Sequence, residues 1–372
     1  MQTINWNMKI RVIVVSPFNS TYSSGIAEAE IIKGLSEKGI EIEVILCENS
    51  GFIEYFKEIG IKVYENYPKH KLDAKATKFI RNRILESKAS ILYLTRGKAI
   101  TTGIAAAKGL NIRIVTYMGS NSIHWFDPTS LLTHLNKKVD KIICNSKDIE
   151  KHIRAQHLAP KNKTITIYKG YKTDWFSNIK PIDLAELDIP KDAFVVVCLA
   201  NVRRIKGLTY LIKAASHINK EQNVHFVIAG HGTDKTKYQK LRETSKLKDN
   251  IHLLGHVDEA VRLIAAASVY VQPSIKEGLG RAIQEAMCLG IPQIVTNAGG
   301  CVELIDKDKS GIVVPKKKPK AIAQAISELQ NNPELRESMG TEAKKRISSI
   351  FNIDITVNRM NKLFGDLMKE ID

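Results

Sequence analysis

The sequence contains no long uninterrupted apolar run. A helix needs roughly 18 to 20 consecutive apolar residues to span a bilayer, and no stretch of the chain approaches this length. The first residues, Met1 to Lys9, also lack the apolar segment of a secretory signal. We therefore expect a cytoplasmic protein.

Cysteine is scarce, with five residues in a chain of 372. The five are scattered and mostly lie in apolar stretches, which is typical of buried reduced thiols and not of a disulfide framework or zinc site. A G-x-G-x-x-G sequence is also missing, because Lys235 stands where the third glycine would follow Gly230 and Gly232. This absence argues against a nicotinamide dehydrogenase.

Aromatic residues make up only 6% of the chain, and acidic residues are outnumbered by basic ones, which gives a net charge of +17. Such a surface attracts anionic partners, whether nucleic acid, phospholipid or nucleotide phosphates. The low aromatic content and the lack of a recognised binding motif disfavour nucleic acid. A strongly salt-sensitive affinity for DNA or RNA, without binding of a nucleotide donor, would favour it again.

Part of the positive charge is concentrated between Lys69 and Lys88, where seven basic residues face only two acidic ones. Lys71, Lys75 and Lys78 have helical spacing, so we expect them to share one helix face. That face is either simply solvated or forms a patch that binds a membrane surface or an acceptor.

Apolar β-branched runs alternate with helical patterns along the whole chain, which predicts parallel sheets covered by helices. The pattern starts with a strand at Lys9 to Ser16 and restarts with FVVVCL at Phe194 to Leu199, after a polar segment. We therefore predict two doubly wound α/β domains, at residues 1–180 and 181–350, followed by a terminal helix at 351–372. Ligands of such sheets bind beyond the carboxyl ends of the strands.

The segment SIKEGLGRAIQEAM follows the predicted strand Val269 to Gln272. Gly278, Leu279 and Gly280 form a loop at a helix start, where free backbone N–H groups and the helix dipole favour a diphosphate. Glu277 in the loop is placed to accept hydrogen bonds from a sugar, and Glu285 farther along the helix is placed to accept them from a ribose. The alternative is that both are solvated helix glutamates.

Two further strand ends carry candidate ligand residues. ANVRRIKG follows the strand Phe194 to Leu199, and its Arg203 and Lys206 are cations suited to a diphosphate leaving group. In SSGIA, after the first strand, Gly25 allows a backbone to approach a ligand at a helix start. For the basic loop ANVRRIKG, a surface loop without a ligand is the alternative.

These features, in this order, resemble the retaining glycosyltransferase family 4, whose members have the GT-B fold. The resemblance covers nearly the whole chain. It extends to ITIYKGYKTDWF at Ile165 to Phe176, VIAGHG at Val227 to Gly232, LLGHV at Leu253 to Val257, and TNAGGCVELI within Gly290 to Val313.

The family resemblance implies an arrangement and a role for each candidate. It implies two Rossmann-like domains that face each other across a cleft, with a C-terminal helix that crosses back to the first. Glu277 would contact the transferred sugar, Glu285 the ribose, and Lys206 with Arg203 the diphosphate, while the backbone from Gly278 to Gly280 completes the phosphate site. Gly25 would lie in a first-domain loop beside the donor phosphate and the acceptor.

Some positions depart from the common family pattern. Ala200 and Asn201 replace the usual glycine-arginine pair, so Arg203 must supply the second cation. Met118 stands where many relatives have a histidine, and His124 in GSNSIHWFDP is a candidate catalytic substitute, with Trp125 and Asp127 either shaping an acceptor pocket or packing a loop. A structural role for the lone histidine is the alternative.

The expected activity follows from the resemblance. It implies transfer of a hexose from a UDP- or GDP-sugar to a glycan or lipid-linked acceptor, with retention, in lipopolysaccharide or other cell-surface polysaccharide synthesis at the inner face of the cell membrane. No Asp-x-Asp sequence follows a predicted strand, so we expect no metal and no cofactor. A nucleotide-sugar epimerase on the same fold remains an alternative, and a non-catalytic binder of anionic ligands is another.

Overall fold

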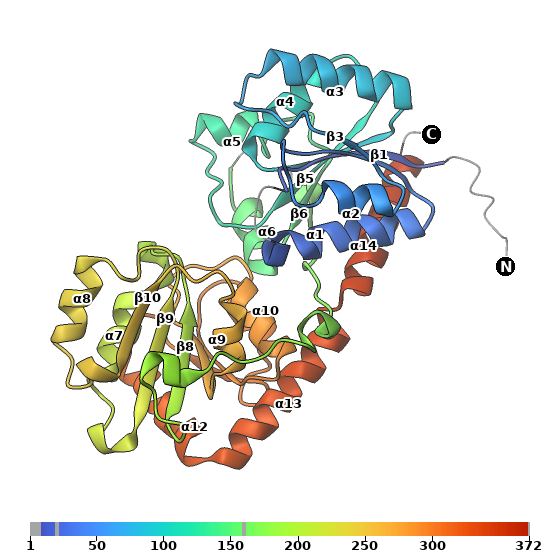
Figure 1. The fold of residues 1–372 in the computed structure, drawn as a ribbon. Coiled ribbons are helices and arrows are strands. Elements are labelled where there is room, and N and C mark those ends of the chain that lie inside the picture. The colour runs from blue at the N-terminus through green and yellow to red at the C-terminus, as the bar shows by residue number, and fades with distance from the viewer. Residues whose placement is uncertain (1–8, 19–21, 158–160, 371–372) are drawn as a thin grey trace. The chain divides into compact units, whose positions relative to one another are not determined.

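A computed structural model describes residues 9–18, 22–157 and 161–370. The chain divides into two compact units, which are described separately (Figure 1). Unit 1 comprises residues 1–170 and 353–372, and unit 2 comprises residues 171–352. The first boundary therefore falls after Gly170, whereas the sequence suggested Lys180. Within the described ranges, no helix combines the length and apolar character required to cross a bilayer.

Unit 1 contains a seven-stranded parallel sheet in the order β3-β2-β1-β4-β5-β6-β7. The strands are β1 (Arg11–Val15), β2 (Glu41–Ile45), β3 (Lys62–Tyr64), β4 (Ile91–Thr95), β5 (Arg113–Met118), β6 (Lys141–Cys144) and β7 (Thr164–Thr166). The first six helices of this unit are α1 (Tyr22–Glu37), α2 (Ile53–Glu58), α3 (Ala74–Ser87), α4 (Gly97–Ala106), α5 (Pro128–Leu132) and α6 (Lys147–Arg154).

The last helix, α14 (Ile353–Lys369), belongs to unit 1 although it follows unit 2 in the chain. It packs on α1, where Gly34 leaves room for Val357: a Cβ on Gly34 would lie 2.7 Å from that side chain. The buried face of α14 includes Met360 and Phe364. Apolar burial against α1 therefore explains why the chain returns to this unit.

Unit 2 contains a six-stranded parallel sheet in the order β10-β9-β8-β11-β12-β13. The strands are β8 (Phe194–Leu199), β9 (Val224–Ala229), β10 (Ile251–Gly255), β11 (Val269–Gln272), β12 (Gln293–Thr296) and β13 (Ile312–Val314). The α-helices are α7 (Leu208–Ala215), α8 (Thr236–Glu243), α9 (Val261–Ala265), α10 (Arg281–Cys288), α11 (Cys301–Leu304), α12 (Pro319–Asn331) and α13 (Pro333–Ile350).

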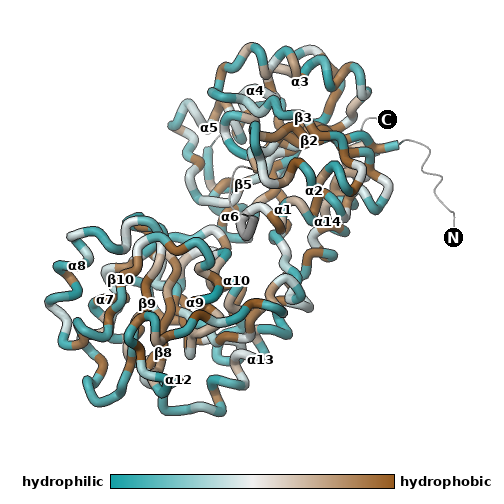
Figure 2. Tube along the Cα trace, viewed as in Figure 1, coloured by the Kyte–Doolittle hydropathy of each residue, from teal (hydrophilic) through white to brown (hydrophobic). Residues whose placement is uncertain are grey.

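In both units the central strands are apolar and buried, as Figure 2 shows by their brown colour. All five residues of β4 and all six of β9 are buried. Strands buried on both faces are typical of parallel sheets with helices on either side. This confirms the predicted α/β class with two Rossmann-like sheets.

The basic segment between Lys69 and Lys88 differs from the prediction. Helix α3 begins only at Ala74, because the Asp73 side chain accepts a hydrogen bond from the backbone N–H of Ala76 and caps the helix. Lys71 therefore precedes the helix, and the predicted shared face with Lys75 and Lys78 is wrong for this residue.

Candidate functional site

In unit 2 the candidate residues lie at the point where the strand order reverses. Strands β8 and β11 are neighbours in the sheet, while the chain runs from β8 outward through β9 to β10 before it returns to β11. The loops that follow β8 and β11 therefore diverge and leave room for a ligand beyond the strand ends. ANVRRIKG and SIKEGLG are these two loops.

Close backbone contact joins the two loops. Gly207 has φ +69°, and a Cβ on it would lie 1.9 Å from the carbonyl oxygen of Pro273. Close by, the carbonyl of Ile205 accepts a hydrogen bond of 2.6 Å from the N–H of Ile275. Only glycine fits at position 207, so the sequence brings the β8 loop against the β11 loop.

This contact places Lys206 and Glu277 together. The Nζ atom of Lys206 lies 2.7 Å from Oε2 of Glu277, which also accepts a hydrogen bond of 3.0 Å from the Ser274 hydroxyl. A buried chain of hydrogen bonds continues from Ser274 to Gln272 and on to the Tyr270 hydroxyl. The Glu277 side chain is only 12% exposed, so its position is fixed before any ligand arrives.

The loop from Gly278 to Gly280 leads into the amino-terminal end of α10. Gly280 has φ +95° and serves as N-cap without a side-chain hydrogen bond, and its carbonyl accepts hydrogen bonds from the N–H groups of Ile283 and Gln284. The N–H groups of the first two helix residues are thus the ones that a ligand can use. Gly300, after β12, also packs closely here, since a Cβ on it would lie 1.8 Å from the carbonyl oxygen of Gly278. A helix N-terminus beside Lys206 favours an anion.

Glu285 lies in the second turn of α10 and is 6% exposed. Burial raises the pKa of this carboxyl, and the nearby Arg281 guanidinium, 3.4 Å away, acts in the opposite direction. A buried carboxyl group without full charge compensation costs stability. Such groups are concentrated at functional sites.

Arg203, a second cation of this loop, is exposed, and its extended backbone leads into the short 3₁₀ turn Arg204–Lys206. Asn201 has a structural role, because its side-chain oxygen accepts a hydrogen bond of 3.0 Å from the N–H of His231. Gly230, with φ +135°, permits this approach of the β9 loop to the β8 loop. The departure at Asn201 is therefore accommodated by the neighbouring loop.

Unit 1 has its own switch point between β1 and β4. The Thr95 hydroxyl donates to the Ser16 hydroxyl, which donates to one oxygen of Glu28, and Lys169 Nζ lies 3.3 Å from the other oxygen. Burial acts to lower the pKa of Lys169, but the Glu28 carboxylate and Tyr117 outweigh it, so the pKa lies above its usual value. The polar groups at this edge bind one another.

Gly25 lies in the first turn of α1, which begins at Tyr22, and not in the loop before it. A Cβ on Gly25 would lie 2.4 Å from the Phe52 ring. The expected place in a loop is therefore wrong, and packing against Phe52 explains this glycine. Its role beside the donor stays a prediction.

His124 lies in the segment between β5 and α5. Its ring stacks on Phe126, with centroids 5.2 Å apart, and meets the ring of His152 edge-on. Asp127 caps α5 by accepting a hydrogen bond of 3.0 Å from the N–H of Thr129. Packing and capping account for these contacts, while a catalytic role of His124 stays a prediction.

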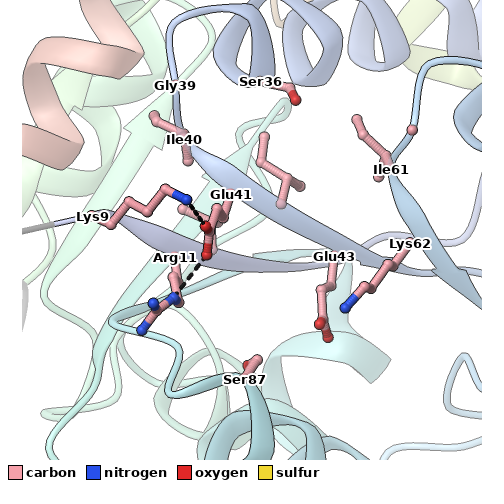
Figure 3. Close-up of a pocket in the computed structure, with 13 residues that line it drawn as sticks. Lys9, Arg11, Ser36, Gly39, Ile40, Glu41, Glu43, Ile61, Lys62 and Ser87 are labelled. Carbon is pink, nitrogen blue, oxygen red and sulfur yellow. Dashed lines mark hydrogen bonds and ion pairs between the residues drawn. The ribbon is translucent and has the colours of Figure 1, made fainter.

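An open hollow lies at the opposite, amino-terminal edge of the unit 1 sheet (Figure 3). Glu41 there pairs with both Lys9 and Arg11. Because ligands of parallel sheets bind at the carboxyl edge, we do not assign the catalytic site to this hollow.

Within the described residues, no group of three or more His, Cys, Asp or Glu side chains is placed so that it could bind a metal ion. Asp306 and Asp308 form an Asp-x-Asp sequence, but it follows helix α11 and not a strand.

Family models match both units. The model for glycosyl transferases group 1 matches residues 180–346, and the model for glycosyltransferase family 4 matches residues 29–175. The chain is therefore a group 1 glycosyltransferase of family 4, and it has the GT-B fold.

Curated relatives include a capsular polysaccharide biosynthesis glycosyltransferase, CapM of Staphylococcus aureus, 27% identical over 62% of this chain and 62% of the relative. The N-acetyl-alpha-D-glucosaminyl L-malate synthase of Bacillus anthracis is 24% identical over 98% of each chain. The chain thus aligns with less than two thirds of the length of CapM, but with nearly all of the Bacillus protein.

Solved structures share the fold. A glycosyltransferase from Rickettsia africae superposes with a TM-score of 0.81 at 19% identity, covering 97% of this chain and 99% of its own. Anabaena HepE, solved in complex with UDP, has a TM-score of 0.78 at 18% identity, covering 96% of this chain and 100% of its own.

Proposed function

We propose that this glycosyltransferase moves a hexosyl group from a UDP- or GDP-sugar to a glycan or lipid-linked acceptor, with retention of anomeric configuration and without a metal ion. The observation that carries the proposal is the Lys206–Glu277 pair, held beside the open N-terminus of α10 at the switch point of unit 2. This arrangement presents a cation, a carboxylate and free N–H groups to one ligand.

Each part of a nucleotide-sugar has a proposed partner there. Lys206 and Arg203 bind the diphosphate together with the backbone from Gly278 to Gly280. Glu277 accepts hydrogen bonds from the sugar, and Glu285 accepts them from the ribose. A diphosphate also gives Lys206 a second anionic partner, which frees one oxygen of Glu277 for the sugar.

The proposed reaction breaks the bond between the sugar C1 and the phosphate oxygen and forms a bond from C1 to the acceptor oxygen on the same face. The acceptor proton passes to the departing phosphate. Lys206, Arg203 and the α10 dipole stabilise the negative charge that develops on this phosphate. These fixed positive groups replace a metal ion in the proposal.

The biological context is proposed from relatives and from charge. CapM is named for capsular polysaccharide biosynthesis, and WclY of Escherichia coli, 29% identical over 45% of this chain, is named for O-antigen biosynthesis. We therefore place the chain in lipopolysaccharide or other cell-surface polysaccharide synthesis, in the cytoplasm at the inner face of the cell membrane. Its partners there are a nucleotide-sugar, a glycan or lipid-linked acceptor and an anionic membrane surface, with no nucleic acid.

The experiment that tests this function is incubation of the full chain with UDP- and GDP-sugars and a membrane extract, with detection of the released nucleoside diphosphate. We expect acceptor-dependent release that persists in EDTA, and NMR of the product should show the anomeric configuration of the donor. Inversion would refute retention, and loss of release in EDTA would refute metal independence. Formation of a free sugar epimer without acceptor would support the epimerase alternative instead.

A further inference from the structure

Exposed apolar side chains are concentrated on one part of unit 1. Ten large apolar residues of the described chain are substantially exposed, and five of them belong to the segment before α3 or to the segment 125–132. Their exposed fractions are 84% for Leu72, 47% for Trp125, 68% for Phe126, 37% for Leu131 and 58% for Leu132. We name these five residues, with Lys71 and Lys75, the apolar-basic surface.

A contact of Lys71 connects the two segments. The Nζ atom of Lys71 lies 3.5 Å from the hydroxyl of Thr129 in α5, which brings the residues before α3 next to that helix (Figure 1). Within the second segment, the rings of Trp125 and Phe126 have centroids 5.9 Å apart. The exposed side chains therefore lie in two neighbouring segments and are not scattered over the surface.

The backbone beneath these side chains is held in place. The N–H of Trp125 donates to the side chain of Gln156 at 3.1 Å, and Asp127 accepts hydrogen bonds from the N–H of Thr129 and the hydroxyl of Ser130. Apolar side chains on a fixed backbone cannot all turn inward. Contiguous exposed apolar groups of this kind mark an interaction surface.

The basic side chains beside this surface indicate what kind of partner it binds. Arg81 donates to the carbonyls of Ala106 and Lys108, and Arg83 pairs with Glu43, so these two cations of the basic segment serve the fold. Lys71 precedes the exposed Leu72 in the chain and contacts Thr129, and the exposed Lys75 lies in the first turn of α3. The nearby Asp73 and Asp127 are both occupied as helix caps.

We propose that the apolar-basic surface docks on the headgroup region of an anionic lipid bilayer. The leucine and aromatic side chains enter the boundary between headgroups and acyl chains, while Lys71 and Lys75 bind lipid phosphates. The two contributions are complementary, because each is weak alone and together they give stable attachment. The inference rests on the proposed location at a membrane and names the surface responsible.

The test is sedimentation of the full chain with phosphatidylcholine vesicles, with and without phosphatidylglycerol. We expect binding that requires phosphatidylglycerol and weakens at high salt. We also expect Trp125 emission to shift to the blue on binding, a change that Trp125→Phe should remove. Failure to sediment at low salt would overturn the proposal, as would equal binding to both kinds of vesicle.

Paired variants separate the apolar and the charged contributions. Phe126→Ser with Leu132→Ser should weaken vesicle partitioning about tenfold or more, and Lys71→Gln with Lys75→Gln about thirtyfold at low salt. Leu85→Ser with Val302→Ser removes exposed apolar residues elsewhere, and Lys237→Gln with Lys240→Gln removes two lysines of α8, so these controls should bind vesicles as the wild type does. Equal losses in the controls would contradict the assignment.

Calorimetric titration with UDP and GDP keeps this result distinct from the proposed chemistry. The Phe126→Ser, Leu132→Ser variant should keep the wild-type nucleotide affinity while it loses vesicle binding. Normal vesicle binding by a chain that binds no nucleotide would instead leave the surface supported and refute the donor site.

Discussion

The charged side chains at the carboxyl edges of the two sheets differ in their surroundings. In unit 1, Lys169, Glu28, Ser16 and Thr95 bind one another in a partly buried network. In unit 2, Lys206 is paired with Glu277 but lies beside an open helix N-terminus and the exposed Arg203. The same topology thus fixes the structure at one edge and leaves ligand-binding groups available at the other.

Removing Lys206 should have the largest effect. Lys206→Ala should lower the transfer rate about 100- to 1000-fold, because it removes a positive group from the developing phosphate charge. Lys213→Ala, an exposed lysine on α7, is the matched control and should leave the rate unchanged. Comparable activity in the two variants would show that the edge of unit 2 is not the phosphate site.

Breaking the pair in unit 1 should change stability and not donor binding. Lys169→Met should lower the free energy of unfolding by about 3 kcal/mol, because Glu28 is left without its cation, while Glu28→Gln with Lys169→Met should recover much of this loss. Denaturant unfolding measures both. A loss of UDP or GDP affinity in the double variant would contradict the contrast between the two edges.

The close approach of the unit 2 loops can be tested with a single methyl group. Gly207→Ala should cost about 1 to 3 kcal/mol more in unfolding free energy than Gly290→Ala. Both glycines have similar positive φ, but a Cβ at 290 has no neighbour closer than 3.7 Å, whereas at 207 it meets the Pro273 carbonyl. Equal costs would show that the strain comes from φ alone.

The smallest effect concerns pH. Because burial raises the pKa of Glu285, the folded protein binds more protons than the unfolded chain above the usual carboxyl range, so its stability falls as pH rises through that window. Glu285→Gln should remove this loss and raise Tm relative to wild type at pH 8, with the difference vanishing near pH 4. Thermal unfolding across pH measures it, and an unchanged difference at all pH values would contradict the assignment.

The sequence predicts the regular core of each sheet well. The strands expected at Phe194 to Leu199 and at Val269 to Gln272 have the same bounds as β8 and β11, and the strand expected at Lys9 to Ser16 contains β1. The predictions do not include the strands β3, β7 and β13, each of three residues. Runs this short carry too little periodicity to be distinguished from loops, and their pairing depends on the sheet edge beside them.

Contacts within the candidate site were harder to predict. The sequence identified Lys206 and Glu277 separately, but their pairing depends on Gly207 meeting Pro273 across two loops. Neither Gly300 nor its contact with Gly278 was predicted from the sequence. Lys169 and Glu28 are 141 positions apart, and no local pattern connects residues so distant in the chain. The glycines in the loops that follow β8 and β12, Gly207 and Gly300, are the signal that could have indicated the close contacts in unit 2.

The most direct measurement of the donor site is calorimetric titration of the full chain with UDP, GDP and ADP, repeated with Lys206→Ala and Glu285→Ala. The proposed site predicts that one nucleotide binds the wild type and that both substitutions weaken it strongly. If no nucleotide binds at millimolar concentration, or if both variants bind as the wild type does, the assignment of the donor to the carboxyl edge of unit 2 is wrong.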